Sequence, residues 1–442
     1  MDRFEKQYPL NARAKEIEKI VQFAGKKQSS QLISVPGAGR STVLRLLAYN
    51  EKIREHHLKE KSANYLFVYI NFAELPSLDT PSLQKTIFLS LLAGIREFGP
   101  EKEPWTRIGK EIYAIFKEAV SLNDNFVLSE YLKKTMKQLN NETIIPVFLF
   151  DRFSEFAENI QPDFFASLKA TRIASNNTLA VVFSTHRSLE NLLSKTHWGD
   201  FYELLVNNHI YLELYDSIAT NFRLDVLEKE YGNKIDPDIR EILVKLTGGH
   251  GRLMKLGAQI LLTENKKIAK EDIQDILLDD MLIRDSLLEI WQSLTPEERR
   301  ILKEYIFGNT TLEQFNNSTI PKLHLPFPLI SEFIRRNIPE TMNPKTIRIH
   351  EQTNEIFFGD DPIAGLTAYE FKLLKFLLDN PDRVCDRNEI INAVWSDTKS
   401  QEGVSDEALD QMTYRLRKKI EDEADNPKHL LTIKGRGFRF LP

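Results

Sequence analysis

A glycine turn near the start of the chain carries the residue types that bind phosphate. The segment 32–47 reads LISVPGAGRSTVLRLL, an apolar strand followed by a turn and an amphipathic helix. Glycines let successive backbone amides converge on phosphate oxygens, the start of the helix adds its positive dipole end, a cation reaches the terminal phosphates, and a hydroxyl binds magnesium. The spacing therefore predicts a nucleotide-binding loop. The residues expected to hold the nucleotide are Gly37, Gly39, Arg40, Ser41 and Thr42.

Two positions depart from the usual G-x-x-x-x-G-K-S/T pattern of a P-loop. Ser34 stands where the first glycine is expected, and Arg40 replaces the lysine. Gly37 can supply the flexibility that the turn needs, and an arginine still contacts phosphate, although its planar guanidinium is not equivalent to an ammonium. The departures keep a second interpretation open, in which the glycine turn is retained for packing and binds no nucleotide.

A second apolar run, residues 143–151, ends in the carboxylate of Asp151. In P-loop enzymes such an aspartate holds Mg²⁺ from the strand next to the P-loop, so we expect Asp151 and Ser41 to share the metal. A helix N-cap is the alternative role for Asp151. Arg152 occupies the position that often carries a catalytic glutamate, which leaves Glu155 either as the general base or as a plain surface residue. Any ATP hydrolysis should therefore be slow.

Strand and helix patterns alternate through the first half of the chain. Strands are expected at 65–72, 143–151, 179–187 and 210–214, and helices at 81–98, 105–120, 128–139 and 163–174. This alternation predicts an α/β fold with a parallel sheet covered by helices on both faces. Ligands then bind at the carboxyl ends of the strands, where the glycine turn, Asp151 and the segment 184–187 all fall.

The order of these features resembles the STAND branch of P-loop ATPases, relatives of the AAA+ proteins that act as nucleotide-controlled switches. The resemblance covers residues 10–337 and includes LTGGHGRLMKL at 246–256 and the segment 290–336. It implies a P-loop nucleotide-binding domain, a helical lid and a middle winged helix. Polar, proline-bearing segments at 235–238 and 337–344, with a further boundary at 279–285, divide the chain into 1–235, 236–280 and 281–338.

The same resemblance implies further contacts with ATP or ADP. His250 and Arg187 would contact the nucleotide, and Arg13 would lie near the adenine. Gly251 replaces the proline of the family's Thr-Gly-Gly-His-Pro motif. A local structural role for His250 and a solvated position for Arg187 are the alternatives.

The last hundred residues combine a basic helix with a basic hairpin. Helical patterns at 367–378 and 386–394 precede a third at 406–420, and alternating apolar residues flank Gly435 and Gly437. Two short strands joined by a tight turn are expected there. The residues of the third helix expected to pack inward are Leu409, Met412, Leu416 and Ile420.

These motifs, LTAYEFKLLKFLLDNPDRVCDRNEIINAVW, DEALDQMTYRLRKKIE and LLTIKGRGFRF, resemble the DNA-binding domain of OmpR-type response regulators over residues 343–442. The resemblance implies a recognition helix in the major groove of double-stranded DNA and a wing at the neighbouring minor groove or backbone. Phe438 replaces the family's tyrosine, and the usual receiver domain is absent upstream. A protein-binding winged helix is the alternative, because acidic residues dilute the basic surface. The residues expected to contact DNA are Gln411, Tyr414, Arg415, Lys418, Lys419, Lys434 and Arg436.

Composition limits the partners and the compartment. The chain of 442 residues has a formal net charge of -5, so any surface that binds DNA must be local. Cys385 is the single cysteine and the first residues lack a secretory apolar stretch, so a reducing cytoplasm is expected. The most apolar stretches are shorter than the ~20 residues of a membrane span.

These features together predict a cytoplasmic, bacterial transcription regulator in which binding of ATP or ADP replaces receiver phosphorylation as the switch. Two other functions remain open. A DNA-dependent ATPase motor or loader would show vigorous DNA-stimulated turnover. A signalling scaffold would assemble into a homo-oligomer when nucleotide binds and would not bind DNA.

Overall fold

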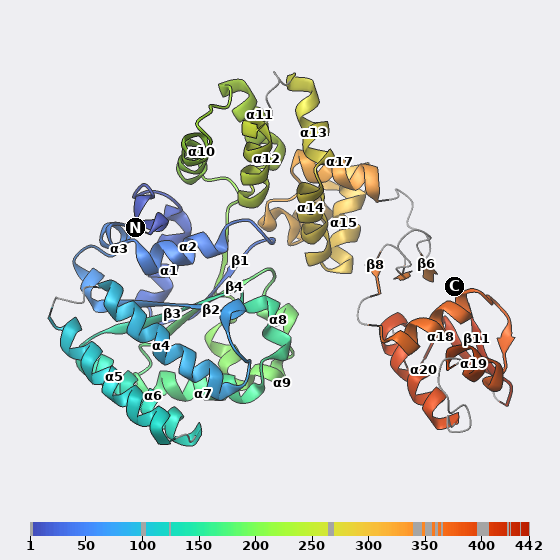
Figure 1. Cartoon of the computed structure of the whole chain (residues 1–442), viewed down its shortest axis with the longest axis horizontal. Coiled ribbons are helices and arrows are strands. Elements are labelled where there is room, and N and C mark those ends of the chain that lie inside the picture. The colour runs from blue at the N-terminus through green and yellow to red at the C-terminus, as the bar shows by residue number, and fades with distance from the viewer. Residues whose placement is uncertain are drawn as a thin grey trace. The chain divides into compact units, whose positions relative to one another are not determined.

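The computed structural model of the chain contains two compact units, Met1–Ile334 and Arg335–Pro442, each with its own core (Figure 1). The residues that it describes are 3–98, 103–122, 125–263, 269–338, 347–349, 356–358, 361–363, 366–395, 406–421, 424, 426–433 and 435–441.

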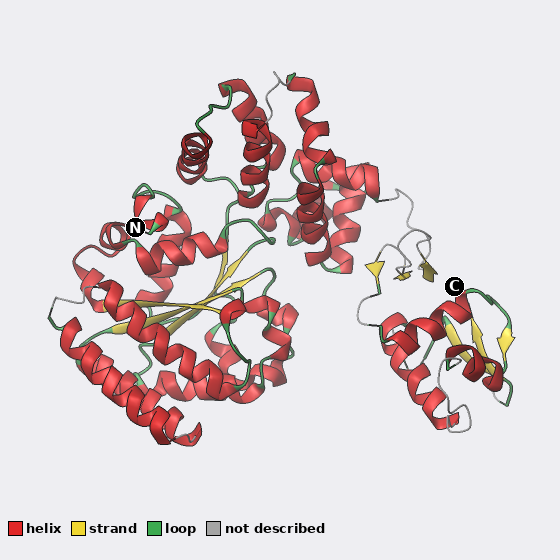
Figure 2. Ribbon diagram, viewed as in Figure 1, coloured by secondary structure: helices red, strands yellow, loops and turns green. Residues whose placement is uncertain are grey.

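A five-stranded parallel sheet forms the centre of the first unit (Figure 2). Its strands are β1 (Ser30–Ile33), β2 (Tyr65–Asn71), β3 (Ile145–Asp151), β4 (Ala180–Thr185) and β5 (His209–Tyr211). The order across the sheet is β2-β3-β4-β1-β5, and every pairing is parallel. The predicted α/β fold with a parallel sheet is confirmed.

One expectation about this sheet was wrong. The strand that carries Asp151 is not next to the strand of the glycine turn, because β4 lies between β3 and β1. The chain leaves β1 for the edge strand β2 and then adds β3 and β4 one after the other, so β4 fills the place beside β1. Consecutive strands that pair with one another commonly build a sheet in this way.

Both faces of the sheet are buried. Alternate residues of a strand point to opposite faces, and β3 and β4 are buried at nearly every position. Aromatic rings fill one face, with Phe150 and Phe153 at 5.3 and 4.7 Å from Phe183 between ring centroids. The helices of this part are α1 (Ala14–Gly25), α2 (Arg40–Tyr49), α3 (Glu51–Leu58), α4 (Thr80–Phe98), α5 (Trp105–Leu122), α6 (Asn125–Asn141) and α7 (Pro162–Ala174).

Helices make up the rest of the first unit. Residues 217–279 contain α10 (Ser217–Tyr231), α11 (Pro237–Thr247), α12 (Gly251–Thr263) and α13 (Ile273–Asp279), and α10 packs against α12. The last three of these helices fall within the predicted lid, residues 236–280. They are followed by α14 (Met281–Ser293), α15 (Pro296–Phe307), α16 (Leu312–Asn317) and α17 (Pro328–Asn337). Residues 281–338 are all described and contain no β-strand, so the middle winged helix stays a prediction. The domain bounds at 235 and 280 also stay predictions.

The second unit is a winged helix. Its helices are α18 (Ala368–Leu378), α19 (Arg387–Val394) and α20 (Asp406–Ile420), and its strands are β6 (Ile347–Ile349), β7 (Ile356–Phe358), β8 (Asp361–Pro362), β9 (Val384–Cys385), β10 (Leu430–Ile433) and β11 (Gly437–Phe440). The hairpin β10-β11 pairs with β9, which confirms the predicted hairpin after the third helix. The four residues predicted to face inward from α20 are all buried, as is Cys385.

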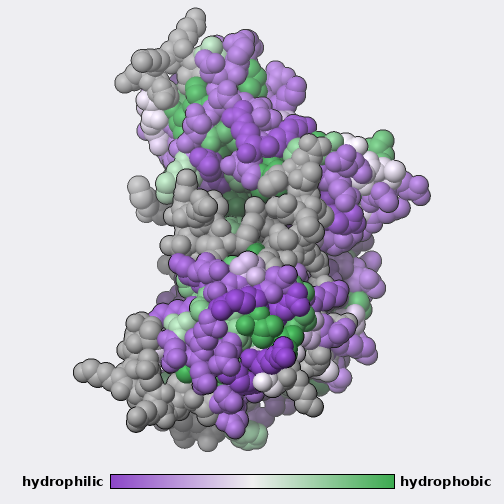
Figure 3. All heavy atoms as spheres, turned by 90° about the vertical axis from the view of Figure 1, so that its right-hand side faces the viewer, coloured by the Kyte–Doolittle hydropathy of each residue, from purple (hydrophilic) through white to green (hydrophobic). Residues whose placement is uncertain are grey.

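Hydrophilic side chains cover most of the described surface on the face drawn in Figure 3, and apolar side chains there form small separate patches. Within the ranges given above, no helix combines the length and the apolarity needed to cross a lipid bilayer.

Candidate functional site

The turn between β1 and α2 adopts a backbone that needs glycine. The φ angle is +78° at Gly37 and +122° at Gly39, a region that residues with a Cβ rarely adopt. A Cβ at Gly37 would also lie 2.9 Å from Nε of Arg252 and 2.9 Å from Cε1 of His250. Gly37 therefore permits both the turn and the close approach of the lid.

Arg40, at the position of the usual lysine, folds back onto the protein. Its Nη1 donates to the carbonyl oxygen of Ser34 and lies 3.3 Å from the Oγ of the same residue. Its Nε donates to Oγ of Ser184, at the end of β4, over 3.1 Å. Burial lowers the pKa of Arg40 to about 10, while the negative charge of Asp151 acts in the opposite direction. The guanidinium thus stays charged at neutral pH and bonds the ends of β1 and β4.

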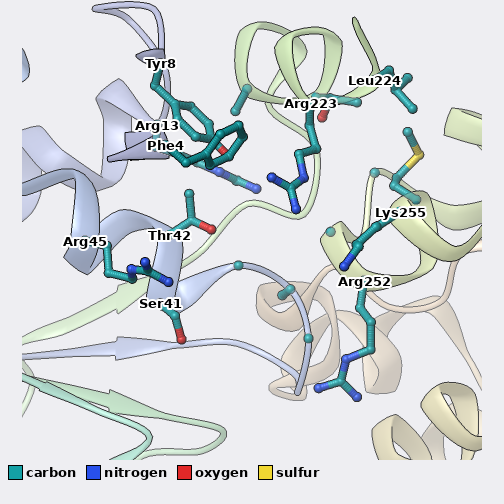
Figure 4. A pocket seen from close by; sticks show the side chains of 18 of the residues that line it. Phe4, Tyr8, Arg13, Ser41, Thr42, Arg45, Arg223, Leu224, Arg252 and Lys255 are labelled. Carbon is teal, nitrogen blue, oxygen red and sulfur yellow. The ribbon is translucent and has the colours of Figure 1, made fainter. Parts of the chain in front are cut away.

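A cavity of about 410 Å³ opens beside the turn (Figure 4). The turn lines one side of it with Gly37, Ala38, Gly39, Ser41 and Thr42, and the lid lines another with Gly249, Gly251, Arg252, Met254 and Lys255. An aromatic and aliphatic part is formed by Phe4, Tyr8, Ala219, Leu224 and Leu227. Of the residues predicted to lie at the nucleotide, five line this cavity: Arg13, Gly37, Gly39, Ser41 and Thr42. Arg40, Arg187, His250 and Asp151 are not among its lining residues.

Positive charge dominates the cavity. One carboxylate, that of Glu5, lines it, and Glu5 is paired with Arg45 at 2.7 Å. In Figure 4 the side chains of Arg13, Arg223 and Lys255 extend toward the space enclosed by the loop, the lid and the aromatic rings. The five cationic residues that line the cavity are Arg13, Arg45, Arg223, Arg252 and Lys255. Such an excess favours a polyanionic ligand.

Sequence reasoning missed four of these five cations. Only Arg13 had been considered, and it was expected near the adenine. In the structure its Nη2 would lie 3.5 Å from a Cβ at Gly39, so its guanidinium reaches the phosphate loop. The other cations come from helices far apart in the chain, and no spacing rule connects α2 with α10 and α12.

The lid contacts the loop through its own backbone and His250. Nε2 of His250 lies 2.8 Å from the carbonyl oxygen of Pro36, so this nitrogen carries the proton. Burial lowers the pKa of His250 to about 4. The backbone N–H of Arg252 donates to the carbonyl oxygen of Gly37 over 3.0 Å. A Cβ at Gly251 would lie 3.1 Å from the carbonyl oxygen of Ala38, so glycine at the expected proline position lets α12 approach the loop.

Asp151 and Glu155 are both engaged within the protein. Asp151 is 1% exposed, with Oδ2 accepting from the hydroxyl of Tyr69 over 2.6 Å and Oδ1 accepting from the backbone N–H of Arg152 over 2.9 Å. Burial and the Asp151 charge raise the pKa of Tyr69, so its hydroxyl stays protonated. Glu155 accepts from Nε of Arg152 over 2.9 Å.

Arg187 follows the end of β4 and contacts the middle helices. It donates to the carbonyl oxygen of Ser293, the last residue of α14. Arg252 reaches the same helix through an ion pair with Glu289. Two arginines near the carboxyl edge of the sheet thus bond to α14, one from β4 and one from the lid.

In the second unit, α20 has one buried face and one exposed face. Gln411, Tyr414, Arg415 and Lys418 are exposed, on the face opposite the core residues. Nζ of Lys418 lies 4.7 Å from the centroid of the Tyr414 ring. Four of the predicted DNA contacts therefore lie on one solvent-facing side of the helix.

The other predicted DNA contacts that the structure describes differ in their surroundings. Arg436 is exposed in the turn of the hairpin, whereas Lys419 donates to the buried carboxylate of Glu370 over 2.7 Å. Burial alone would raise the pKa of Glu370, but the bonds from Lys419 and Thr367 hold it below its usual range. Lys434 lies outside the described residues.

Some of the acidic side chains near this basic surface accept hydrogen bonds from groups within the same domain. Asp410 accepts from Nη2 of Arg387 over 2.7 Å. Glu421 accepts from three backbone N–H groups, those of Lys428, His429 and Leu430, over 2.7–2.9 Å. These carboxylates join α20 to α19 and to the start of the wing.

The wing depends on two glycines with different surroundings. Gly435 has φ of +72° and open space around it, whereas Gly437 has φ of +126° and a Cβ there would lie 2.0 Å from the carbonyl oxygen of Cys385. Arg417 holds the hairpin from α20, with its Nη2 donating to the carbonyl oxygen of Leu430 over 2.8 Å and to Oγ1 of Thr432 over 2.7 Å.

Residues 361–440 match the family described as "Transcriptional regulatory protein, C terminal". Protein PetR of Rhodobacter capsulatus is 28% identical over 224 residues, which are 47% of this chain and 94% of PetR. Sensory transduction protein RegX3 of Mycolicibacterium smegmatis is 35% identical over 98 residues, which are 21% of this chain and 39% of RegX3. The match thus spans well under half the length of RegX3.

Among solved structures, a Walker-type ATPase of Pyrococcus abyssi aligns with 81% of this chain and 95% of its own, at 15% identity and a TM-score of 0.43. The first unit itself is a parallel α/β fold with a glycine turn between β1 and α2. The second unit is an OmpR-type winged helix of the transcriptional regulatory kind.

Proposed function

We propose that this chain is a transcription regulator whose binding to double-stranded DNA is controlled by ATP or ADP. The observation that carries the proposal is the cavity beside the glycine turn, where phosphate-loop residues, aromatic rings and five cations surround one space. It belongs to a chain whose other unit matches a family of transcriptional regulatory proteins.

The cavity suits both ends of a nucleotide. The rings of Phe4 and Tyr8, with centroids 5.4 Å apart, offer an apolar surface for a purine. At the loop, α2 begins beside the cavity with the positive end of its dipole, and Gly39, Ser41 and Thr42 line the cavity there. We infer that the phosphates bind at this helix start and the base binds between the rings and α10.

DNA binding is assigned to the exposed face of α20 and to the wing. We infer that α20 enters the major groove, where Gln411 and Arg415 read base edges and Lys418 contacts phosphate. Arg436 would reach the minor groove or backbone from the turn of the hairpin. Lys419 is excluded from a primary contact, because it neutralises Glu370 inside the domain.

Control follows from the contacts that nucleotide would change. A ligand shifts an equilibrium between two arrangements only by its differential affinity for them, typically ~1–3 kcal/mol. Arg252 lines the cavity and pairs with Glu289 of α14, so phosphate and Glu289 compete for one guanidinium. Hydrolysis is slow in this proposal, because Glu155, the candidate general base, is held by Arg152 and does not line the cavity.

Magnesium is the ion that P-loop folds usually hold beside the phosphates. The donor set does not fit it here. Of Ser41 and Asp151, the pair predicted from the sequence, only Ser41 lines the cavity, and both oxygens of Asp151 already accept hydrogen bonds. In the described ranges, no group of three or more His, Cys, Asp and Glu side chains could hold a metal.

Two measurements on the purified chain test the proposal. Calorimetry should detect binding of ATP and ADP, and selection against random DNA duplexes should enrich a sequence whose recovery differs between nucleotide-free, ADP and ATP conditions. An Arg415→Ala variant, with its exposed cation removed, should lose the enrichment. Failure to bind nucleotide, or enrichment that is identical under all three conditions, would contradict nucleotide control.

A further inference from the structure

We propose that the cavity binds the metal-free ADP or ATP anion. Protein cations then neutralise the phosphate charge that a divalent metal ion neutralises in most P-loop sites. The inference rests on the proposed function and specifies the form of the ligand. It is carried by the donors that the cavity has and by the cations that line it.

The oxygen donors needed for a metal are few. Mg²⁺ binds in an octahedron of oxygen ligands and is commonly anchored by one or two carboxylates together with phosphate oxygens and water. The one carboxylate that lines the cavity, that of Glu5, is 6% exposed and held by Arg45 at 2.7 Å. Ser41 offers a hydroxyl but no charge.

Asp151 is compensated within the protein. Its two oxygens accept from Tyr69 and from the backbone of Arg152, and the positive charge of Arg40 interacts with it. Arg40 is held in place by Ser34 and Ser184. A dication placed against Asp151 would be repelled by the buried positive charge of Arg40, which already interacts with this carboxylate.

Other cations are placed to balance phosphate charge. Arg13 is anchored by carbonyl oxygens of Glu213 and Leu214, which leaves its guanidinium directed at the phosphate loop. The guanidinium of Arg223 lies 4.8 Å from the ring centroid of Phe4, and in the described part of the chain neither Arg223 nor Lys255 makes an ion pair. Charge-assisted bonds from such groups to phosphate are stronger than neutral ones.

This arrangement gives magnesium an unusual effect. A bound Mg²⁺ neutralises part of the phosphate charge that the cations attract, so it reduces the attraction without gaining a carboxylate ligand. Nucleotide affinity should therefore be equal or higher when the metal is removed.

Isothermal calorimetry on the full chain, with ADP and with ATP, in EDTA and in millimolar Mg²⁺, tests this. The Kd in EDTA should not exceed the Kd in Mg²⁺ by more than about threefold. A larger weakening in EDTA would overturn the inference and leave nucleotide binding intact. Absence of binding in both buffers would remove the proposed function itself, so the two failures are distinguishable.

Three variants make the test specific. Lys255→Ala should raise the Kd in EDTA by about tenfold, whereas Lys245→Ala, an exposed lysine on α11 that does not line the cavity, should not change it. Asp151→Asn should leave the Kd for ADP within about threefold in both buffers. A loss of affinity in Asp151→Asn confined to the Mg²⁺ buffer would show that Asp151 holds a metal. If that variant unfolds, the wild-type comparison and the lysine pair decide.

Discussion

The two positions at which the phosphate loop departs from the usual pattern contact each other, since the guanidinium of Arg40 donates to the carbonyl oxygen of Ser34 and lies 3.3 Å from its Oγ. Ser184 of β4 holds the same guanidinium from the other side. A lysine could not make this forked set of bonds. The serine and the arginine are therefore one structural change, which turns a cation usually aimed at phosphate into a bond within the sheet edge.

Removing this guanidinium should destabilise the first unit. Arg40→Ala leaves buried acceptors at Ser34 and Ser184 without a donor, which should lower the free energy of unfolding by about 1–3 kcal/mol. Lys15→Ala is the control, because its ion pair with Glu213 is exposed on both sides and should contribute about 1 kcal/mol or less. Urea unfolding of both variants checks this, and equal losses would contradict a structural role for Arg40.

The competition for Arg252 predicts an effect on nucleotide affinity. Glu289→Gln removes the charge that holds the guanidinium on α14, so ATP should bind about three to ten times more tightly. Glu297→Gln, which breaks an exposed ion pair with Arg300 on α15, is the control and should leave the Kd unchanged. Calorimetry with ATP measures both, and an unchanged Kd in Glu289→Gln would show that the pair does not compete.

His250 predicts a pH dependence of stability. Burial lowers its pKa from the ordinary 6.5 to about 4, so the unfolded chain binds a proton in this window that the folded chain does not. The contribution is fully present above pH 6.5 and is lost as the pH falls toward 4, by up to about 3 kcal/mol.

Melting temperatures of wild type and His250→Gln across this range check the assignment. Glutamine can still donate to the carbonyl oxygen of Pro36, so the variant should fold and lose less stability on acidification. His56→Gln, at an exposed histidine, should retain the wild-type slope. Parallel curves for wild type and His250→Gln would rule out this source.

Much of the second unit could be predicted from the sequence, and for a physical reason. The period of 3.6 residues in α20 reports burial directly, so its inward and outward faces were assigned correctly. The hairpin was predicted because alternation and paired glycines are local signals. The ion pair of Lys419 could not be predicted, because its partner Glu370 lies 49 residues away and no local pattern connects the two.

The first unit shows the same limit more strongly. Apolar runs identified the strands, but pairing order depends on contacts across the whole sheet, so β4 between β1 and β3 could not be inferred. The loop residues that line the cavity could be predicted, because they belong to the P-loop motif. Arg223 and Lys255 belong to no motif, and only the folding of α10 and α12 over the loop brings them to it.

The two glycines of the wing predict unequal costs. Gly437→Ala forces a Cβ into the carbonyl oxygen of Cys385 at a strained φ, so β9 and β11 must separate, with a loss of about 3 kcal/mol or more. Gly435→Ala meets only the strain of its φ and should cost about 1 kcal/mol. Thermal unfolding separates the two, and equal effects would contradict the close approach at Gly437.

Ion pairing predicts which cations set the salt dependence of DNA binding. Arg415→Ala, Lys418→Ala and Arg436→Ala should each weaken binding, with a shallower salt slope where a phosphate contact is lost. Arg439→Ala should leave that slope unchanged, because Nε of Arg439 bonds to Asp382 over 2.7 Å. Fluorescence anisotropy over a salt series measures this. Equal slope changes in all four variants would mean that the pair with Asp382 opens on DNA.

Cys385 makes the wing observable without any added label. It is the single cysteine of the chain, it is fully buried, and burial raises the pKa of its thiol. Because the thiol lies in the core of the second unit and β11 pairs with β9 at Phe438, a thiol reagent can reach the sulfur only when this core opens. The alkylation rate of the intact protein therefore reports how often the core beside the wing opens, and its change on addition of DNA or nucleotide would measure how far that opening is coupled to either ligand.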